Sequence, residues 1–339
     1  MLVPAPVWLR IGLLATFGLA PVAAQQGVVP AQVGEKVPDF EFPPFQNGDG
    51  RQQLADFAGQ PVLIVFWSHV RDIGPRSHGL KEALATDRKL RGQGLVSLFV
   101  EASKAAPDDV QALLWGECSG FDGRVTVADL QMPLPEIQDP SVMLIGVDGR
   151  LLLVQKLERW YGDFSEDLLR ELAKVANGWG DNAEIAKVRA ALYGKGSFAT
   201  ARTLVPAVPD DKARERVLAE IEAVFARRVT AVEWLTRAGR LVDAKAAVEA
   251  LQQGTTGAAD LQERVAPLVA ALATDAAKKA LAVDQKLDKL LGKVRDGRFR
   301  GDLLHDLEPI AKAAKGTAVA TRIAKLCADL QWLVQAGRR

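Results

Sequence analysis

Residues 62–76 read VLIVFWSHVRDIGPR, and this stretch decides the fold of the first part of the chain. Five apolar residues, most of them β-branched or aromatic, precede Trp67, which is typical of a central strand buried on both faces. A polar loop follows and leads into a predicted helix over residues 75–91, with Leu80, Leu84 and Leu90 on one face. A buried strand that enters a helix through such a loop indicates an α/β domain.

The segments around this unit complete the domain. The turn Asp148-Gly149 lies between two apolar runs, which is a hairpin signal. Strands are predicted over residues 95–100 and 125–128 and on both sides of this turn, and helices over 107–115 and 164–176. The order strand, helix, strand, helix, strand, strand, helix favours a mixed sheet with helices on both faces.

Four motifs over residues 34–157 resemble the thioredoxin-like group that includes the thiol-specific antioxidant and cytochrome-maturation thiol-disulfide proteins. They are Gly34…Pro38-Asp39-Phe40, Leu54–Gly59, Val62–Trp67 and Pro140…Asp148-Gly149-Arg150. The resemblance implies a thioredoxin-like α/β fold for residues 34–178. It also implies that Pro140 follows a cis peptide bond, a rare state, and faces the active site.

The reactive cysteines of that family are missing from the matching loop. Disulfide chemistry needs a thiolate at the start of the helix, where the helix dipole lowers the thiol pKa. Arg71 and Gly74 occupy the two cysteine positions in an ungapped alignment, and a two-residue insertion puts Ile73-Gly74-Pro75-Arg76 there instead. The threonine and cysteine of the peroxidase branch are also absent. No catalytic residue carries over, and we expect a degenerate active-site loop of Trp67, His69, Arg71, Asp72, Ile73, Gly74, Pro75 and Arg76.

Two other kinds of chemistry, metal binding at this loop and a lone reactive thiol, are alternative hypotheses. His69, Asp72 and His78 could ligate a metal ion, but their spacing matches no ligand pattern, so we predict a solvated polar loop without metal or cofactor. Cys118 could be a lone reactive thiol, although the neighbouring Glu117 raises rather than lowers a thiol pKa. Cys118 and Cys327 are the two cysteines of the chain, and we expect no disulfide framework from them.

The first 24 residues have the pattern of a secretory signal peptide. Arg10 precedes an apolar run from Ile11 to Leu19, and Val22-Ala23-Ala24 supplies small residues for cleavage. The alternative is an uncleaved membrane anchor, but the apolar run is short for a bilayer. A polar linker over residues 25–33 follows. We therefore expect an exported protein, periplasmic or extracellular, with no stable membrane insertion.

The rest of the chain, residues 181–335, is predicted to be all α-helical and repeat-like. Ala, Leu, Lys, Arg and Glu dominate this region. Gly196-Ser197-Phe198 is echoed at Gly239-Arg240-Leu241 and in part at Gly297-Arg298-Phe299, each between two predicted helices, as in a tetratricopeptide-like hairpin. Helices are expected over residues 182–194, 198–206, 210–226, 229–238, 241–252, 258–273, 275–295, 300–314 and 317–335. Such arrays present a binding face, for which Arg227, Arg228, Arg237 and Arg240 are candidates, or they only pack on the first domain.

Composition narrows the function. The 339 residues carry 43 Lys and Arg against 42 Asp and Glu, so nothing indicates a nucleic-acid partner. We expect a redox-inactive module that binds a protein or extended peptide of the cell envelope by strand addition beside Pro140 and Trp67. The alternatives are a thiol-disulfide oxidoreductase or peroxidase that uses Cys118, a non-redox enzyme that uses His69, Asp72 and His78, and a purely structural role. Oligomeric state does not follow from the sequence.

Overall fold

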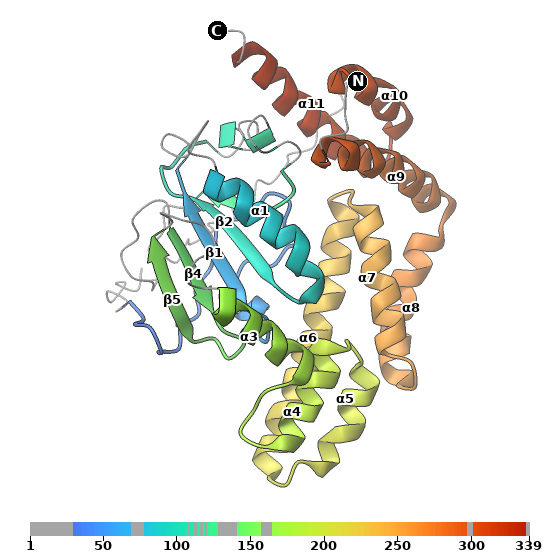
Figure 1. The fold of residues 1–339 in the computed structure, drawn as a ribbon. Coiled ribbons are helices and arrows are strands. Elements are labelled where there is room, and N and C mark those ends of the chain that lie inside the picture. The colour runs from blue at the N-terminus through green and yellow to red at the C-terminus, as the bar shows by residue number, and fades with distance from the viewer. Residues whose placement is uncertain are drawn as a thin grey trace, which may run out of the picture.

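The structure is a computed structural model that describes residues 30–68, 78–106, 109–110, 114–115, 118, 121–127, 141–156, 165–296 and 301–336. The predicted signal peptide lies outside the described residues. A sheet domain comes first in the chain, and a curved row of helices runs along one side of it (Figure 1).

The sheet domain is built around the stretch that begins at Val62. Strand β1 (Val62–Trp67) is central in a five-stranded sheet of order β3-β2-β1-β4-β5. β1 is parallel to β2, β2 is parallel to β3, and β4 is antiparallel to both β1 and β5. The other strands are β2 (Val96–Glu101), β3 (Arg124–Val127), β4 (Ser141–Ile145) and β5 (Leu151–Lys156). This order and these directions define a thioredoxin-like α/β fold, as predicted.

Alternate residues of β1 enter two different cores, because successive side chains of a strand point to opposite faces. Leu63, Val65 and Trp67 pack with helices α1 (His78–Leu90) and α3 (Ser165–Asn177). Val62, Ile64 and Phe66 pack instead with buried side chains of residues 31–57. The expected helices on both faces are therefore wrong for the described residues. An extended segment with one short 3₁₀ turn (Leu54–Phe57) covers the second face.

The second domain is helical throughout its described residues, which confirms the predicted class. Its elements are α4 (Ala183–Arg189) with a π turn (Ala190–Gly194), α5 (Phe198–Leu204), α6 (Asp211–Arg237), α7 (Leu241–Gly254), α8 (Ala259–Ala273), α9 (Asp275–Arg295), α10 (Leu303–Ala314) and α11 (Val319–Ala336). The two helices expected over residues 210–226 and 229–238 are one continuous helix, α6. The residues between them are Arg227 and Arg228, which are good helix formers, so nothing ends the helix there.

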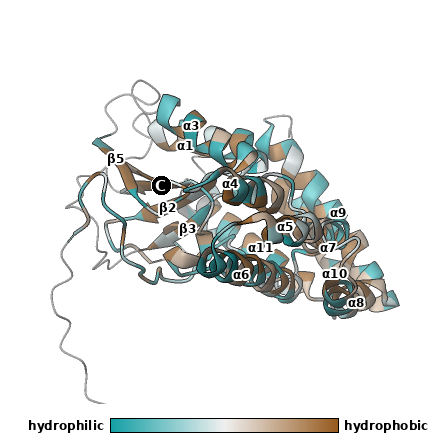
Figure 2. Ribbon diagram, turned by 90° about the horizontal axis from the view of Figure 1, so that it is seen from below, coloured by the Kyte–Doolittle hydropathy of each residue, from teal (hydrophilic) through white to brown (hydrophobic). Residues whose placement is uncertain are grey.

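The helical domain has two cores. One is formed by α4 to α8 and contains Phe198 and Phe225, whose rings meet edge to face with centroids 5.3 Å apart. The other joins α9, α10 and α11 to Leu241 at the start of α7. Figure 2 shows that the helices carry both polar and apolar residues, as expected for helices that bury one side.

The two complete copies of the glycine motif have the same local geometry. Gly196 and Gly239 both have positive φ, +66° and +69°, and each precedes the N-cap of a helix. Both turns are also approached closely by another backbone. A Cβ on Gly254 would lie 2.1 Å from the carbonyl oxygen of Gly196, and one on Gly239 would lie 2.4 Å from that of Ala318. Gly297 lies outside the described residues, so the tetratricopeptide-like character stays a prediction.

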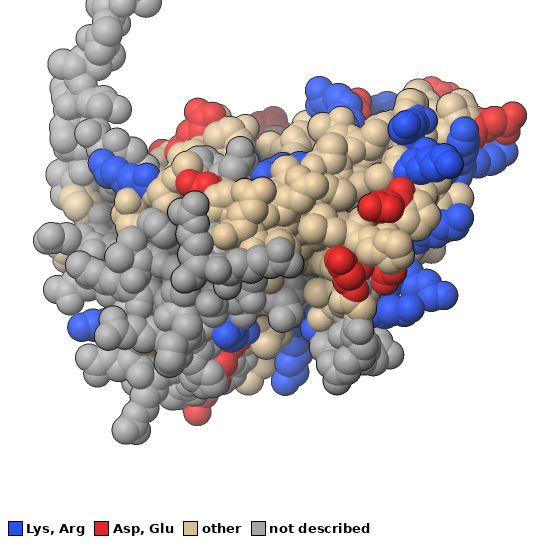
Figure 3. Space-filling model, turned by 90° about the horizontal axis from the view of Figure 1, so that it is seen from above, with Lys and Arg blue, Asp and Glu red and all other residues tan. Residues whose placement is uncertain are grey.

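Two further observations concern the surface. No helix within the described ranges is both long enough and apolar enough to cross a membrane. On the face drawn in Figure 3, acidic and basic side chains are interspersed, which agrees with the nearly balanced charge of the sequence.

Truncating the centre of the first helical core should destabilise the protein strongly. Phe225 is fully buried, so Phe225→Ala is expected to lower the free energy of unfolding by about 3–5 kcal/mol through lost burial and a residual cavity. Leu218→Ala, on the same helix but 46% exposed, should stay within about 0.5 kcal/mol of wild type. Urea denaturation followed by circular dichroism measures both. Equal losses would show that α6 does not bury the face described here.

Candidate functional site

Most of the predicted active-site loop lies outside the described residues. The residues concerned are His69, Arg71, Asp72, Ile73, Gly74, Pro75 and Arg76, and Pro140 lies outside as well. His78 begins α1. The proposed groove beside Pro140 therefore stays a prediction.

Trp67, which we expected to contact a bound peptide, belongs to the core. It is 1% exposed and packs with the α1 side of the sheet. Its indole Nε1 is buried without a hydrogen-bond partner among the described residues. Opposite it in β2 lies the buried Glu101, whose carboxylate accepts hydrogen bonds from the backbone N–H groups of Ser103 (3.0 Å) and Ala105 (3.1 Å). Burial excludes Trp67 as a surface contact in this conformation, so that part of the prediction is corrected.

The thiols are unfavourably placed for redox chemistry. Cys118 is 6% exposed and packs in the core of the sheet domain. Cys327 is partly buried in the helical domain, and burial raises the pKa of its thiol. The two residues are not joined in a disulfide. Among the described residues, no group of three or more His, Cys, Asp or Glu side chains is arranged to hold a metal ion.

Helix α6 and the turn after it hold the two domains together. Arg227 donates a hydrogen bond to the carbonyl oxygen of Ala55 (3.1 Å). Arg240 donates to the carbonyls of Asn47 (2.7 Å) and Gly48 (2.9 Å) and also pairs with Asp243 (2.8 Å). These arginines therefore bind the sheet domain itself and are not a free binding face.

The other two arginines of the predicted face differ from these and from each other. Arg228 is half-buried, and its guanidinium lies 5.2 Å from the ring centroid of Phe198. Burial lowers the pKa of Arg228. Arg237 is exposed and lines the cavity described below. Of the four predicted residues, only Arg237 is an exposed side chain at a candidate site.

Two glycines permit the close approach of α6 and its neighbours to the sheet domain. Gly50 (φ +85°) lies under the ring of Trp234, and a Cβ there would be 2.6 Å from the indole. Gly59 (φ +82°) lies against Tyr193, whose ring would be 2.2 Å from such a Cβ. Any side chain at these positions would meet both a clash and an unfavourable φ. The segment from Gly50 to Gly59 is thus packed between the sheet and the helices.

A half-buried ion cluster anchors the start of this segment. Asp49 pairs with Arg51 (2.7 Å) and with Arg124 of β3 (3.3 Å). Burial by itself raises the pKa of Asp49, but attraction to Arg51 and Arg124 outweighs it and holds that pKa well below its usual value. Asp49 is therefore ionised and stabilises the segment over the whole physiological pH range.

A second ion cluster, around Asp122, links the two domains near the start of β3. The carboxylate of Asp122, just before β3, pairs with Arg88 (2.8 Å) and Arg91 (3.3 Å) from α1 and its end. It also pairs with Arg295 of α9 (3.7 Å), which in turn binds Asp288 (3.1 Å). One carboxylate thus receives cations from both domains.

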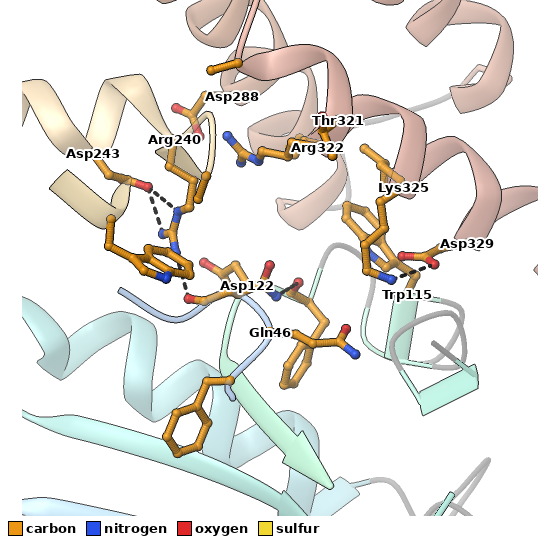
Figure 4. Close-up of a pocket in the computed structure, with 18 of the residues that line it drawn as sticks. Gln46, Trp115, Asp122, Arg240, Asp243, Asp288, Thr321, Arg322, Lys325 and Asp329 are labelled. Atoms are coloured by element: carbon orange, nitrogen blue, oxygen red, sulfur yellow. Dashed lines mark hydrogen bonds and ion pairs between the residues drawn. The ribbon is translucent and has the colours of Figure 1, made fainter. Parts of the chain in front are cut away.

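Asp122, Arg91 and Arg295 of the second cluster line a cavity of about 430 Å³ (Figure 4). That volume lies within the range of small-ligand clefts. The sheet domain and the helical domain both supply its walls, and the wall residues are Phe45, Gln46, Asn47, Arg91, Trp115, Phe121, Asp122, Trp234, Arg237, Ala238, Arg240, Asp243, Asp288, Leu291, Arg295, Ala318, Thr321, Arg322, Lys325, Leu326 and Asp329. It is the candidate functional site.

The cavity lies beside the residues that lead into β3. Asp122 precedes β3, which runs parallel to β1, whereas the redox loop follows the end of β1 at Trp67. The cavity residue Asp122 therefore lies at the amino-terminal end of the parallel strands, whereas Trp67 lies at their carboxyl-terminal end. Asn47, with φ +56°, donates hydrogen bonds to the carbonyls of Phe121 (3.4 Å) and Gly123 (3.3 Å) and fixes the cavity wall to β3.

Arg322 enters the cavity from α11. Figure 4 shows its side chain extending towards Arg240 and Asp288. One guanidinium nitrogen pairs with Asp284 (2.6 Å), which is 1% exposed and also accepts the backbone N–H of Val242 (2.8 Å). Burial raises the pKa of Asp284 and lowers that of Arg322, and in each case it outweighs the attraction between them. The attraction between Asp284 and Arg322 therefore offsets only part of the free energy that the two charges lose on leaving water.

Comparison with known proteins adds the following. No protein-family model matches the chain, and no curated protein matches it in sequence. Among solved structures, it is similar to a candidate thioredoxin from Neisseria meningitidis (20% identity, 43% of this chain and 95% of that one, TM-score 0.35). It is also similar to a candidate thiol:disulfide interchange protein DsbE from Chlorobium tepidum (19% identity, 42% of this chain and 96% of that one, TM-score 0.33). A third similar structure is the thioredoxin domain of a thiol-disulfide oxidoreductase from Bacteroides vulgatus (17% identity, 42% of this chain and 96% of that one, TM-score 0.32).

The Asp49 cluster should give stability a measurable pH dependence. The pKa of Asp49 is lower in the folded protein than in the unfolded chain, where it is about 3.9. The carboxylate therefore contributes fully to stability above that pH, and this contribution is lost progressively as the pH falls from there towards the folded pKa. Asp49→Asn should cost about 2 kcal/mol at pH 7. The difference from wild type should persist down to pH 5 and shrink as the pH falls from 4 to 2. Urea unfolding at several pH values measures it.

Asp275→Asn is the matched control, since the side chain of Asp275 is fully exposed. It should unfold like wild type at every pH. An Asp49→Asn difference that stays constant down to pH 2 would contradict the role given to this carboxylate.

Proposed function

We propose that the protein is a redox-inactive thioredoxin-like module of the cell envelope that binds a peptide segment of a partner in the cavity between its two domains. The observation that carries this proposal is the cavity itself, because neither domain forms it alone. Its walls combine aromatic rings with several charged side chains, the usual composition of a specific binding site. The helical domain then has a binding role and is more than an appendage.

The size of the cavity supports a short segment as the ligand. A volume of about 430 Å³ holds a small molecule or a few residues, not the surface of a folded domain. The strand-addition mode near Pro140 would be a separate contact of an extended partner. Export rests on the leader pattern of residues 1–24 and is part of the proposal.

The two cysteines of the chain do not favour thiol chemistry. A reactive cysteine is exposed and has a lowered pKa. Cys118 is buried, and burial raises the pKa of Cys327, so neither has both properties. The thiol-disulfide oxidoreductase alternative therefore depends on an opening of the core around Cys118.

A cavity-filling variant tests the binding site. Thr321 is an exposed residue of α11 that lines the cavity, so Thr321→Trp should fill the space without disturbing a core. We expect wild-type protein to retain members of a pool of random hexapeptides, measured by mass spectrometry. Thr321→Trp should reduce this retention at least about tenfold, the effect of losing contacts worth about 1.4 kcal/mol.

The control places the same bulky side chain beside the cavity. Ala324, on the same helix, is exposed and is not a wall residue, so Ala324→Trp should retain peptides like wild type. Peptide retention that survives Thr321→Trp would remove the cavity as the site.

Redox activity is tested separately by insulin-disulfide reduction with dithiothreitol. Wild-type protein should not exceed the uncatalysed rate, and Cys118→Ser should change nothing. Turnover that Cys118→Ser abolishes would instead establish the thiol-disulfide alternative.

A further inference from the structure

The charges around the cavity do not balance. The ion pairs that line or adjoin it involve Arg88, Arg91, Arg240, Arg295, Arg322 and Lys325 on the one side and Asp87, Asp122, Asp243, Asp284, Asp288 and Asp329 on the other. Arg237 also lines the cavity. Within the described residues it has no ion pair, and its Nε donates only a long hydrogen bond to the carbonyl of Glu233 (3.4 Å). Among these described residues, one positive charge is therefore in excess.

A second cation, Arg322, has hydrogen-bond donors that are not used among the described residues. Arg322 uses one guanidinium nitrogen for Asp284, and its remaining N–H groups have no hydrogen-bond partner among the described residues. They are on the side chain that extends across the cavity towards Arg240 (Figure 4). A planar guanidinium with free donors matches the two oxygens of a carboxylate. Because Arg322 is incompletely compensated, an added anion would stabilise it.

Part of the remaining wall is apolar and aromatic, although Gln46, Asn47 and Thr321 also line the cavity. Phe45, Phe121 and Leu326 are buried, while Trp115 and Trp234 are half-buried at the cavity. Such rings and aliphatic groups gain free energy when they cover an apolar part of a ligand. A ligand whose anionic group is bound here is therefore favoured when it also carries an apolar group next to its charge.

We propose that the cavity recognises a single carboxylate attached to an apolar or aromatic group, with Arg237 and Arg322 as the carboxylate-binding residues. This chemistry occurs at the C-terminal residue of a peptide and in a free organic acid. The inference rests on the proposed function in its peptide form, where it specifies that the bound segment is the end of a chain. The single excess charge favours a monoanion over a doubly charged phosphate.

The test compares two pools of random hexapeptides, one with a free C-terminal carboxylate and one with a carboxamide, offered together to the full chain. The carboxylate pool should be retained about tenfold more than the amide pool, and retained peptides should end in apolar residues, since a charged hydrogen bond is lost with the amide. Phenylpropionate should displace them at millimolar concentration, and inorganic phosphate should not.

Arg237→Gln should remove most of the preference for the carboxylate without affecting folding, because its side chain has no ion pair among the described residues. Replacing Arg322 alone would leave Asp284 buried and unpaired, so the double variant Asp284→Asn/Arg322→Gln is used, with its thermal unfolding measured. Arg216→Gln, an exposed arginine on the same helix as Arg237, should keep the wild-type preference.

The outcomes are distinguishable. Equal retention of both pools, lost in Thr321→Trp, would overturn the carboxylate inference and leave the proposed function standing. Retention of neither pool, with direct binding of phenylpropionate that Arg237→Gln weakens, would support the carboxylate site and overturn the peptide function. Binding of neither peptide nor phenylpropionate, or displacement by phosphate alone, would overturn the inference.

Discussion

The segment from Asn47 to Gln60 is packed on two sides, and the rest of the molecule depends on this packing. On one side Phe57 belongs to the second core of the sheet, and on the other Gly50 and Gly59 accept the rings of Trp234 and Tyr193. The backbone carbonyls that face α6 are satisfied by arginines, which a buried loop requires. The helical domain therefore has a defined position relative to the sheet, and a cavity with a defined lining follows from it.

This arrangement also protects the sheet. β3 is an edge strand of only four residues, and exposed edges invite pairing with other chains. Gln46 pairs with Val125 along part of that edge, and the helical domain stands beside it. The same edge in an isolated thioredoxin-like domain would lack the helices. The cavity lies beside this covered edge.

Prediction from sequence succeeded where a local pattern carried the information. The β-branched run from Val62, the Asp148-Gly149 turn and the glycine turns at Gly196 and Gly239 each specify their own structure through φ preferences and hydrophobic periodicity. It failed where a choice depended on partners far along the chain. Trp67 and Arg240 are amphipathic or charged and looked accessible, yet one is in a core and the other binds carbonyls of residues 47 and 48.

The sequence by itself determined the class of the sheet region, the helical class of the region that follows it and the absence of cysteines directly after the central strand. Only the tertiary structure decided which arginines bind backbone carbonyls of the sheet domain and which have donors left at the cavity. The reason is physical: secondary structure follows from neighbouring residues, whereas the environment of Arg237 or Arg322 depends on how two domains pack. That packing is set by glycines and aromatic rings more than 130 positions apart in the chain.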